Sequence, residues 1–305
     1  MLDLVCVGRI LQEMIVTPED VTGPFMGGPV AYCSVAAARL GSRVGMVTTI
    51  GTDVHEGFLG TLASAGVDTL GIATDSVSTH TELVYDSAGN KDIRYPSISR
   101  PIRAADVPAF YRGASLVYLC SMDNDVPLHD VPDVARAAIV SAADLGGYGG
   151  VHMSKEHRAE VPSLARLACD VASSVDIVKA SAEDTACIFG WNDPLRSATV
   201  LGDAGSRIVL VTLGALGVLV WEQGKHVELP AAISRPVDAT GAGDVFMAGF
   251  LCEYLRQSNT VSAAQWGCAE AAIAIERSGG VHADRMPTRD AVAARVRLSY
   301  QSAAE

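Results

Sequence analysis

The residues best suited to chemistry lie in one short segment, Asp238-Ala239-Thr240-Gly241-Ala242-Gly243-Asp244. Its small residues leave backbone N–H groups unobstructed, and the apolar run 245–255 predicts a buried helix that begins at Gly243–Asp244. Open amides at the positive end of a helix form an anion site. A carboxylate placed there is useful if it takes a proton from a group that attacks a bound phosphate. On these residues alone, an Asp that only caps the helix after a glycine turn fits equally well.

The elements that must position this segment alternate along the chain. Short β-branched runs predict strands at residues 4–7, 44–50, 116–120, 139–143, 177–179 and 208–213. Ala-rich stretches with helical spacing lie between them, for example at 30–40, 57–65 and 162–173. Pro29 can open the first of these helices and Gly41 can close it. The alternation predicts an α/β fold in which helices cover both faces of a parallel sheet.

Two segments interrupt the alternation. Residues 12–23 mix apolar residues with Thr, Pro and acids and have no helical period. Residues 78–99 alternate polar and apolar side chains, with a hairpin turn predicted near 87–90. Together the two segments predict a small antiparallel sheet that projects from the core; two surface loops are the alternative. No internal repeat or linker divides the chain, so we expect a single domain over residues 1–305.

Composition narrows the classes of function. The 305 residues carry 23 Lys and Arg against 35 Asp and Glu, a formal net charge of −12, which argues against nucleic acid or an anionic membrane as partner. A phosphorylated ligand stays compatible, because amides and a metal ion can hold phosphate. The seven cysteines form no C-x-x-C pair and predict buried free thiols. Met1-Leu2-Asp3 lacks the basic start of a signal peptide, and the apolar run 208–221 is too short to span a bilayer, so we expect a cytoplasmic protein.

Several motifs then resemble one family. D-A-T-G-A-G-D-V-F-M-A-G-F, starting at Asp238, resembles the C-terminal signature of ribokinase-like (PfkB) carbohydrate kinases, and residues 27–41 resemble the N-terminal one. Residues 50–53 resemble the family's V-G-x-D, residues 211–217 its nucleotide-side strand and turn, and residues 286–289 its closing I-P-T-R. The resemblance covers essentially the whole chain. It implies a ribokinase-like three-layer sandwich with a mainly parallel central sheet and a small β-sheet lid at about 12–26 and 78–100.

The resemblance also implies roles for individual residues. Asp244 matches the catalytic base, and Gly241, Ala242 and Gly243 match the anion hole that stabilises the transferring phosphoryl group. Gly27 and Gly28 match the backbone at the substrate pocket, while Thr212, Gly214 and Gly217 fall in the ATP-binding region. Asp238 and Thr240, with backbone near 278–280, match a loop that binds K⁺ in many members. ATP and Mg²⁺ are therefore the expected cofactors, K⁺ is a further candidate, and a homodimer through the lid is compatible with the family.

Three positions depart from the family pattern. Glu13 stands where an Asp binds substrate hydroxyls, and Tyr32 replaces a polar Asn, either in the pocket or as core packing. Ser181 and Asp184 replace the Asn and Glu of the N-x-x-E motif that organises water around Mg²⁺, and keep hard oxygen donors. Asp144 follows a predicted strand, and it either faces the substrate or caps the next turn.

These observations favour an ATP-dependent kinase that acts on a small sugar or cyclitol, with a myo-inositol-like polyol preferred. Tyr32 in the first signature resembles the inositol-kinase branch, because an aromatic side chain suits the apolar face of a ring. A nucleoside kinase of the same superfamily is the alternative enzyme, and a silent sugar or nucleotide sensor is the alternative from another class. A dinucleotide-dependent oxidoreductase is disfavoured, because no G-x-G-x-x-G follows the first strand.

Overall fold

A nine-stranded sheet forms the centre of the computed structural model, which describes residues 1–87 and 91–301. The strand order is β13-β12-β11-β10-β9-β8-β1-β4-β5, and all neighbours are parallel except β12 and β13 at one edge. The strands are β1 Leu4–Val7, β4 Val44–Gly51, β5 Asp68–Asp75, β8 Ala114–Leu119, β9 Ala138–Asp144, β10 Ile177–Ser181, β11 Ile208–Thr212, β12 Val218–Glu222 and β13 Lys225–Leu229.

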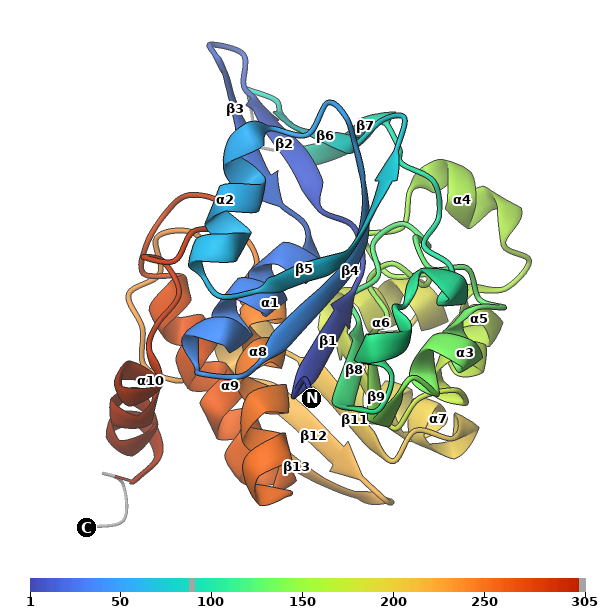
Figure 1. Ribbon diagram of the computed structural model, residues 1–305. Helices are drawn as coiled ribbons and strands as arrows, with labels where there is room; N and C mark the ends of the chain where they lie inside the picture. Colours follow the sequence, from blue (N-terminus) through green and yellow to red (C-terminus); the bar gives the residue numbers. More distant parts are fainter. Residues whose placement is uncertain (88–90, 302–305) are drawn as a thin grey trace.

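Helices cover both faces of this sheet (Figure 1). The α-helices are α1 Pro29–Arg39, α2 Glu56–Ser64, α3 Val131–Ala135, α4 Lys155–Glu160, α5 Leu164–Ala172, α6 Ala182–Phe189, α7 Pro194–Ala204, α8 Ala242–Gln257, α9 Thr260–Ala274 and α10 Arg289–Val296. Short 3₁₀ turns occupy Ala104–Asp106, Ala109–Tyr111 and Gly214–Leu216. In β1, Leu4 and Cys6 pack in the core cluster under α1, α8 and α9, whereas Val5 and Val7 pack in the cluster under α3, α5 and α7. The strand is apolar on both sides because each of its faces is buried.

A second sheet, the lid, stands at the top of the molecule (Figure 1). Its strands are β2 Leu11–Val16, β3 Val21–Gly27, β6 Thr79–Tyr85 and β7 Lys91–Ser97, in the order β3-β2-β6-β7. The prediction of an antiparallel lid is wrong at its centre, where β2 and β6 pair in parallel. Strand β2 follows β1 along the chain, and β6 follows β5. Because β1 and β5 run in the same direction in the main sheet, β2 and β6 enter the lid in the same direction. The turn predicted near 87–90 falls largely outside the described residues.

The predicted α/β architecture is confirmed, with small shifts at the boundaries. Strand β1 has the predicted bounds, and Pro29 opens α1 while Gly41, with φ of 90°, follows its end. Helix α8 begins at Ala242, just before the predicted start, because Gly241 caps it with φ of 75°. The seven cysteines are free thiols, and five of them are buried. Over residues 1–87 and 91–301, every helix is too short or too polar to cross a membrane.

Close packing between α8 and α9 fixes the helix that carries Asp244. Gly267 of α9 lies against α8: a Cβ at this position would come within 2.6 Å of the main-chain oxygen of Phe246. Gly249 of α8 faces back, and a Cβ there would lie 3.0 Å from the Cα of Gly267. Each glycine therefore allows backbone to approach backbone, which a larger residue would prevent.

We expect Gly267→Ala to destabilise the protein by about 1–3 kcal/mol, because the new methyl group meets main-chain atoms that cannot move aside. Gly60→Ala is the matched control, since Gly60 is also helical but has open space around its Cβ position. That control should stabilise the protein by up to about 1 kcal/mol. Thermal unfolding of the three proteins measures both effects. An unfolding temperature for Gly267→Ala at or above that of the parent would contradict the packing argument.

Candidate active site

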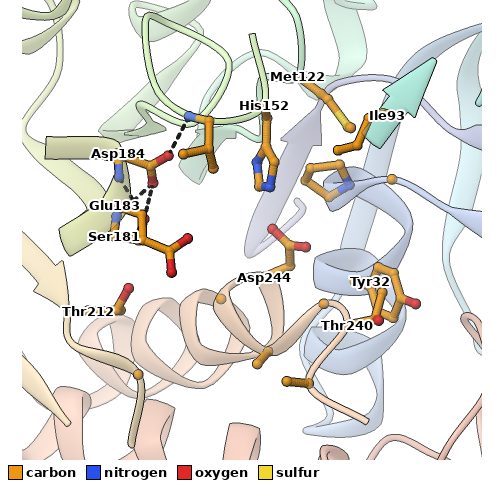
Figure 2. Close-up of a pocket in the computed structure, with 18 of the residues that line it drawn as sticks. Tyr32, Ile93, Met122, His152, Ser181, Glu183, Asp184, Thr212, Thr240 and Asp244 are labelled. Atoms are coloured by element: carbon orange, nitrogen blue, oxygen red, sulfur yellow. Dashed lines mark hydrogen bonds between the residues drawn. The ribbon is translucent and has the colours of Figure 1, made fainter. Parts of the chain in front are cut away.

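A cavity of about 720 Å³ opens at the carboxyl ends of β10 and β11, under the lid. Its walls come from β2, β6 and β7 of the lid, from the start of α1, and from the segment 237–244 that leads into α8. Open α/β sheets bind ligands at this edge. Figure 2 shows Asp244 near the centre of the cavity, with Thr212 and Asp184 towards one side and Tyr32 and Ile93 towards the other.

Asp244 lies in the first turn of α8 and is half-buried. Burial raises the pKa of its carboxyl to about 7; Lys179 acts to lower that pKa, while the carboxylates of Asp144 and Asp184 act to raise it further. A base with a pKa near the working pH combines a large deprotonated fraction with useful basicity. The position and the pKa of Asp244 both suit proton transfer.

The turn before α8 brings small residues against bulky neighbours. A Cβ on Gly241 would lie 2.5 Å from the ring of Tyr32, and one on Gly243 would lie 3.0 Å from Nζ of Lys179. The amides of Ala242 and Asp244 donate to the carbonyls of Ala239 and Gly241, each at 3.1 Å. An anion bound here would therefore compete with the carbonyls of Ala239 and Gly241 for these two N–H donors. The assignment of Gly241, Ala242 and Gly243 to an anion hole stays a prediction.

Lys179 forms a buried ion pair below this turn. Its Nζ donates to Oδ2 of Asp144 at 2.8 Å, and both residues are 4% exposed. Burial acts to lower the pKa of Lys179, but the charges of Asp144, Asp184 and Asp244 outweigh it, so that pKa lies above the ordinary lysine value. Lys179 lines the cavity, whereas Asp144 lies behind it and also accepts the amide of Gly146 at 2.7 Å. Asp144 therefore does not line this cavity itself, and its assignment to substrate binding stays a prediction.

Ser181 and Asp184 form the capping box of α6. The Asp184 carboxylate accepts the amide and hydroxyl of Ser181 at 2.7 and 2.8 Å and the amide of Val151 at 2.9 Å, as the dashed lines in Figure 2 show. Burial acts to raise the pKa of Asp184, but Lys179, His152 and these hydrogen bonds bring it below the ordinary value. Asp184 is thus charged and faces the cavity beside Glu183, which is exposed. Two adjacent carboxylates fit a hard cation such as Mg²⁺.

One side of the cavity is built by β2 and the start of α1. Glu13 lines it, and a Cβ on Gly27 would lie 3.4 Å from Oε2 of Glu13, so Gly27 leaves room for this carboxylate. Gly28 caps α1 with φ of 94° and lines the cavity itself. Tyr32 also lines the cavity but is only 3% exposed, and its hydroxyl accepts a hydrogen bond from Arg285 at 3.3 Å. Both interpretations of Tyr32, pocket and packing, therefore describe part of its environment.

Another side of the cavity includes two of the three residues that the family resemblance assigns to the ATP-binding region. Thr212 and Gly214 line the cavity at the end of β11. Gly217 does not line it: a Cβ there would lie 2.0 Å from the carbonyl oxygen of Leu229, so this glycine allows β12 to pass close to the end of β13. Asp238 and Thr240 line the cavity too, and Oδ1 of Asp238 accepts the amide of Thr240 at 2.9 Å.

Sequence reasoning missed four residues: Lys179, His152, Glu183 and Arg285. Lys179 carried a usable signal, because it is the one charged residue in the run Ile177-Val178-Lys179-Ala180-Ser181. Glu183 lies between two residues that were singled out. His152, which lines the cavity, and Arg285, which is buried behind it, lie in loops whose course depends on distant contacts.

Several known kinases are similar to this chain in sequence or in fold. A cytidine kinase from Thermococcus kodakarensis is 28% identical over 261 residues, which cover 84% of this chain and 90% of that protein. The structure of a fructokinase with bound ATP from Xylella fastidiosa superposes with a TM-score of 0.83 at 22% identity, covering 99% of this chain and all of that one. A pyrophosphate-dependent kinase in the ribokinase family, complexed with a pyrophosphate analog and myo-inositol, superposes with a TM-score of 0.79 at 18% identity, covering 92% and 98%.

The match to a family model is nearly as long as the chain. Residues 1–289 match the model of the pfkB family carbohydrate kinases, which spans both signatures, the lid and the segment that carries Asp244. The central sheet and lid are those of a ribokinase-like fold. This chain therefore belongs to the pfkB family of carbohydrate kinases, which are phosphotransferases with hydroxyl acceptors.

Proposed function

We propose that this kinase transfers the γ-phosphoryl group of ATP to a hydroxyl of a small ring polyol, with a myo-inositol-like cyclitol or related sugar as acceptor. The observation that carries the proposal is the position of Asp244. Its half-buried carboxylate lies at the start of α8, in a cavity that Glu13 lines from the lid and Thr212 lines from the end of β11. One base thus lies between a polar acceptor side and a donor side.

Asp244 takes the proton of the acceptor hydroxyl as that oxygen attacks the phosphoryl group. The ammonium of Lys179 favours the charged form of Asp244, and the ion pair with Asp144 holds that ammonium in place. The carboxylates of Glu183 and Asp184 line the cavity and would hold a Mg²⁺ ion bound with ATP, which would neutralise charge on the phosphates.

The acceptor side has the chemistry of a polyol site. Glu13 offers carboxylate oxygens that accept several hydroxyl protons. Leu11, Leu83 and Ile93 add apolar surface from the lid, which suits the C–H face of a saturated ring. These features support a compact ring with several hydroxyl groups.

A nucleoside is the second candidate acceptor, and one observation favours it. A second cavity of about 740 Å³ lies beside the first, and Ile93, His152 and Glu183 line both. Tyr95 and His157 line the second cavity, and these rings could stack on a base. The similarity to a cytidine kinase points in the same direction.

Asp244→Asn should lower kcat by roughly 10²- to 10⁴-fold, because the amide cannot accept the proton of the acceptor hydroxyl. The dissociation constant for ATP should change little, because the amide keeps the shape of the carboxyl group. Asp203→Asn is the matched control, since Asp203 is an exposed acid on α7 and does not line the cavity. Steady-state phosphorylation and ATP titration of each protein measure the two quantities. Parental turnover in Asp244→Asn would remove the base from the proposal.

The pH dependence of kcat/KM should report the ionisation of Asp244 in the free enzyme. The pKa of about 7 predicts that log kcat/KM rises with unit slope up to about pH 7 and is level above it, since only the deprotonated carboxylate accepts a proton. Rates measured from about pH 5.5 to 9 at constant ionic strength test this profile. A level profile through pH 6 would show that no group with a pKa near 7 controls the reaction.

A substrate panel decides between the two acceptor classes. With saturating Mg²⁺ and ATP, kcat/KM should be higher for myo-inositol or a free sugar than for cytidine or adenosine. A nucleoside preference of about tenfold, or about 1.4 kcal/mol of transition-state binding, would replace the polyol proposal with the nucleoside one. A parallel series with pyrophosphate as donor tests the choice of ATP, because a structural neighbour is pyrophosphate-dependent.

A further inference from the structure

Arg285 is the largest side chain that is buried almost completely, with 1% of its surface exposed. It lies in the segment between α9 and α10, and five protein oxygens accept hydrogen bonds from its guanidinium group. The acceptors are the carbonyl oxygens of Ala274 at 3.3 Å, Asp238 at 3.0 Å, Thr240 at 2.7 Å and Gly279, and the hydroxyl of Tyr32 at 3.3 Å. An arginine has five N–H donors, so the number of acceptors equals the number of donors.

Three of these oxygens come from the two loops for which a potassium site was expected. Asp238 and Thr240 belong to the turn before α8, and Gly279 belongs to the loop after α9. The main-chain oxygens of all three point at the guanidinium group, and Oδ2 of Asp238 lies 3.7 Å from Nη2 of Arg285. A potassium ion bound to the same oxygens would compete with Arg285 and sit beside its buried positive charge. The residues present therefore do not fit K⁺.

We propose that Arg285 is a built-in replacement for a monovalent cation, and that it holds the turn 238–243 in its active shape without K⁺. A cation at this place gathers carbonyl dipoles that would otherwise repel one another. Because the guanidinium group is planar, it directs separate hydrogen bonds to both loops and to Tyr32 on α1. The ring of Tyr32 in turn lies against Gly241. Arg285 is thus a positioning residue, which acts on Asp244 through the turn that begins α8.

The first experiment measures the cation dependence of the unmodified enzyme. At fixed ionic strength, rates in potassium, sodium and tetramethylammonium chloride should agree within about twofold. A several-fold stimulation by potassium over tetramethylammonium would overturn the inference. This readout rests on the proposed kinase function, so a second one that needs no substrate is required.

The second experiment removes the guanidinium group and returns it. Arg285→Ala should lose roughly 10- to 100-fold in kcat/KM, as expected when buried acceptors lose their donors. It should also exchange the amide hydrogens of residues 237–244 faster than the parent. Guanidinium chloride, at concentrations well below those that unfold the protein, should restore activity and slow this exchange. Urea, which has a similar planar shape but no charge, should do neither.

Further controls test whether the turn needs the positive charge of Arg285 or only the volume of its side chain. Arg166→Ala removes an exposed arginine that pairs with Asp170 on α5, and it should match the parent in both measurements. If Arg285→Ala does not fold, Arg285→Gln, which fills part of the space without charge, takes its place. Unchanged exchange in the variant, or equal rescue by urea and guanidinium, would show that charge at this position is not needed. If the proposed kinase function is wrong, the hydrogen-exchange rates of residues 237–244 still test the role of Arg285, because that measurement needs no substrate.

Discussion

The buried ion pair between Lys179 and Asp144 sets the electrostatics of the site. A buried pair adds little stability by itself, because desolvation offsets the attraction between its charges. Here the one ammonium group also faces the charges of Asp184 and Asp244, so a single cation is shared among three carboxylates. Burial and the neighbouring acids drive Asp244 towards its neutral form, while Lys179 favours its charged form. The balance brings its pKa to about 7, where the group can both hold and release a proton.

The parallel sheet produces this arrangement through strand register. Lys179 on β10 and Asp144 on β9 are directly paired, so their side chains emerge on the same face at the same height. A slip of one residue would turn either side chain to the opposite face and separate the two charges. The next strand continues the pattern, since Ser181 pairs with Thr212 on β11 and both line the cavity. The sheet edge therefore delivers polar groups side by side, although the strands that carry them are far apart in sequence.

Local patterns made much of the architecture predictable. The approximate bounds of six of the nine strands of the central sheet, the start of α1 and the glycine turn before α8 follow from nearest neighbours in the sequence. The place of Asp244 at the start of α8 follows in the same way. Long-range features were not predictable in this way. The parallel pairing of β2 with β6 depends on where β1 and β5 end. The position of Asp144 behind the cavity lining depends on its ion pair with Lys179 on the neighbouring strand. Arg285 gave no local signal, because its five acceptors span residues 32–279.

Two internal cations flank the turn before α8 in this acidic protein. Nζ of Lys179 lies 3.0 Å from the Cβ position of Gly243, and Nη2 of Arg285 lies 2.7 Å from the carbonyl oxygen of Thr240. Both cations are buried, so they act on the turn with little screening by water or salt. The surface can therefore keep the net charge of −12 without weakening the field at the turn. The two cations beside the turn are therefore a feature of the interior and do not depend on the charge of the surface.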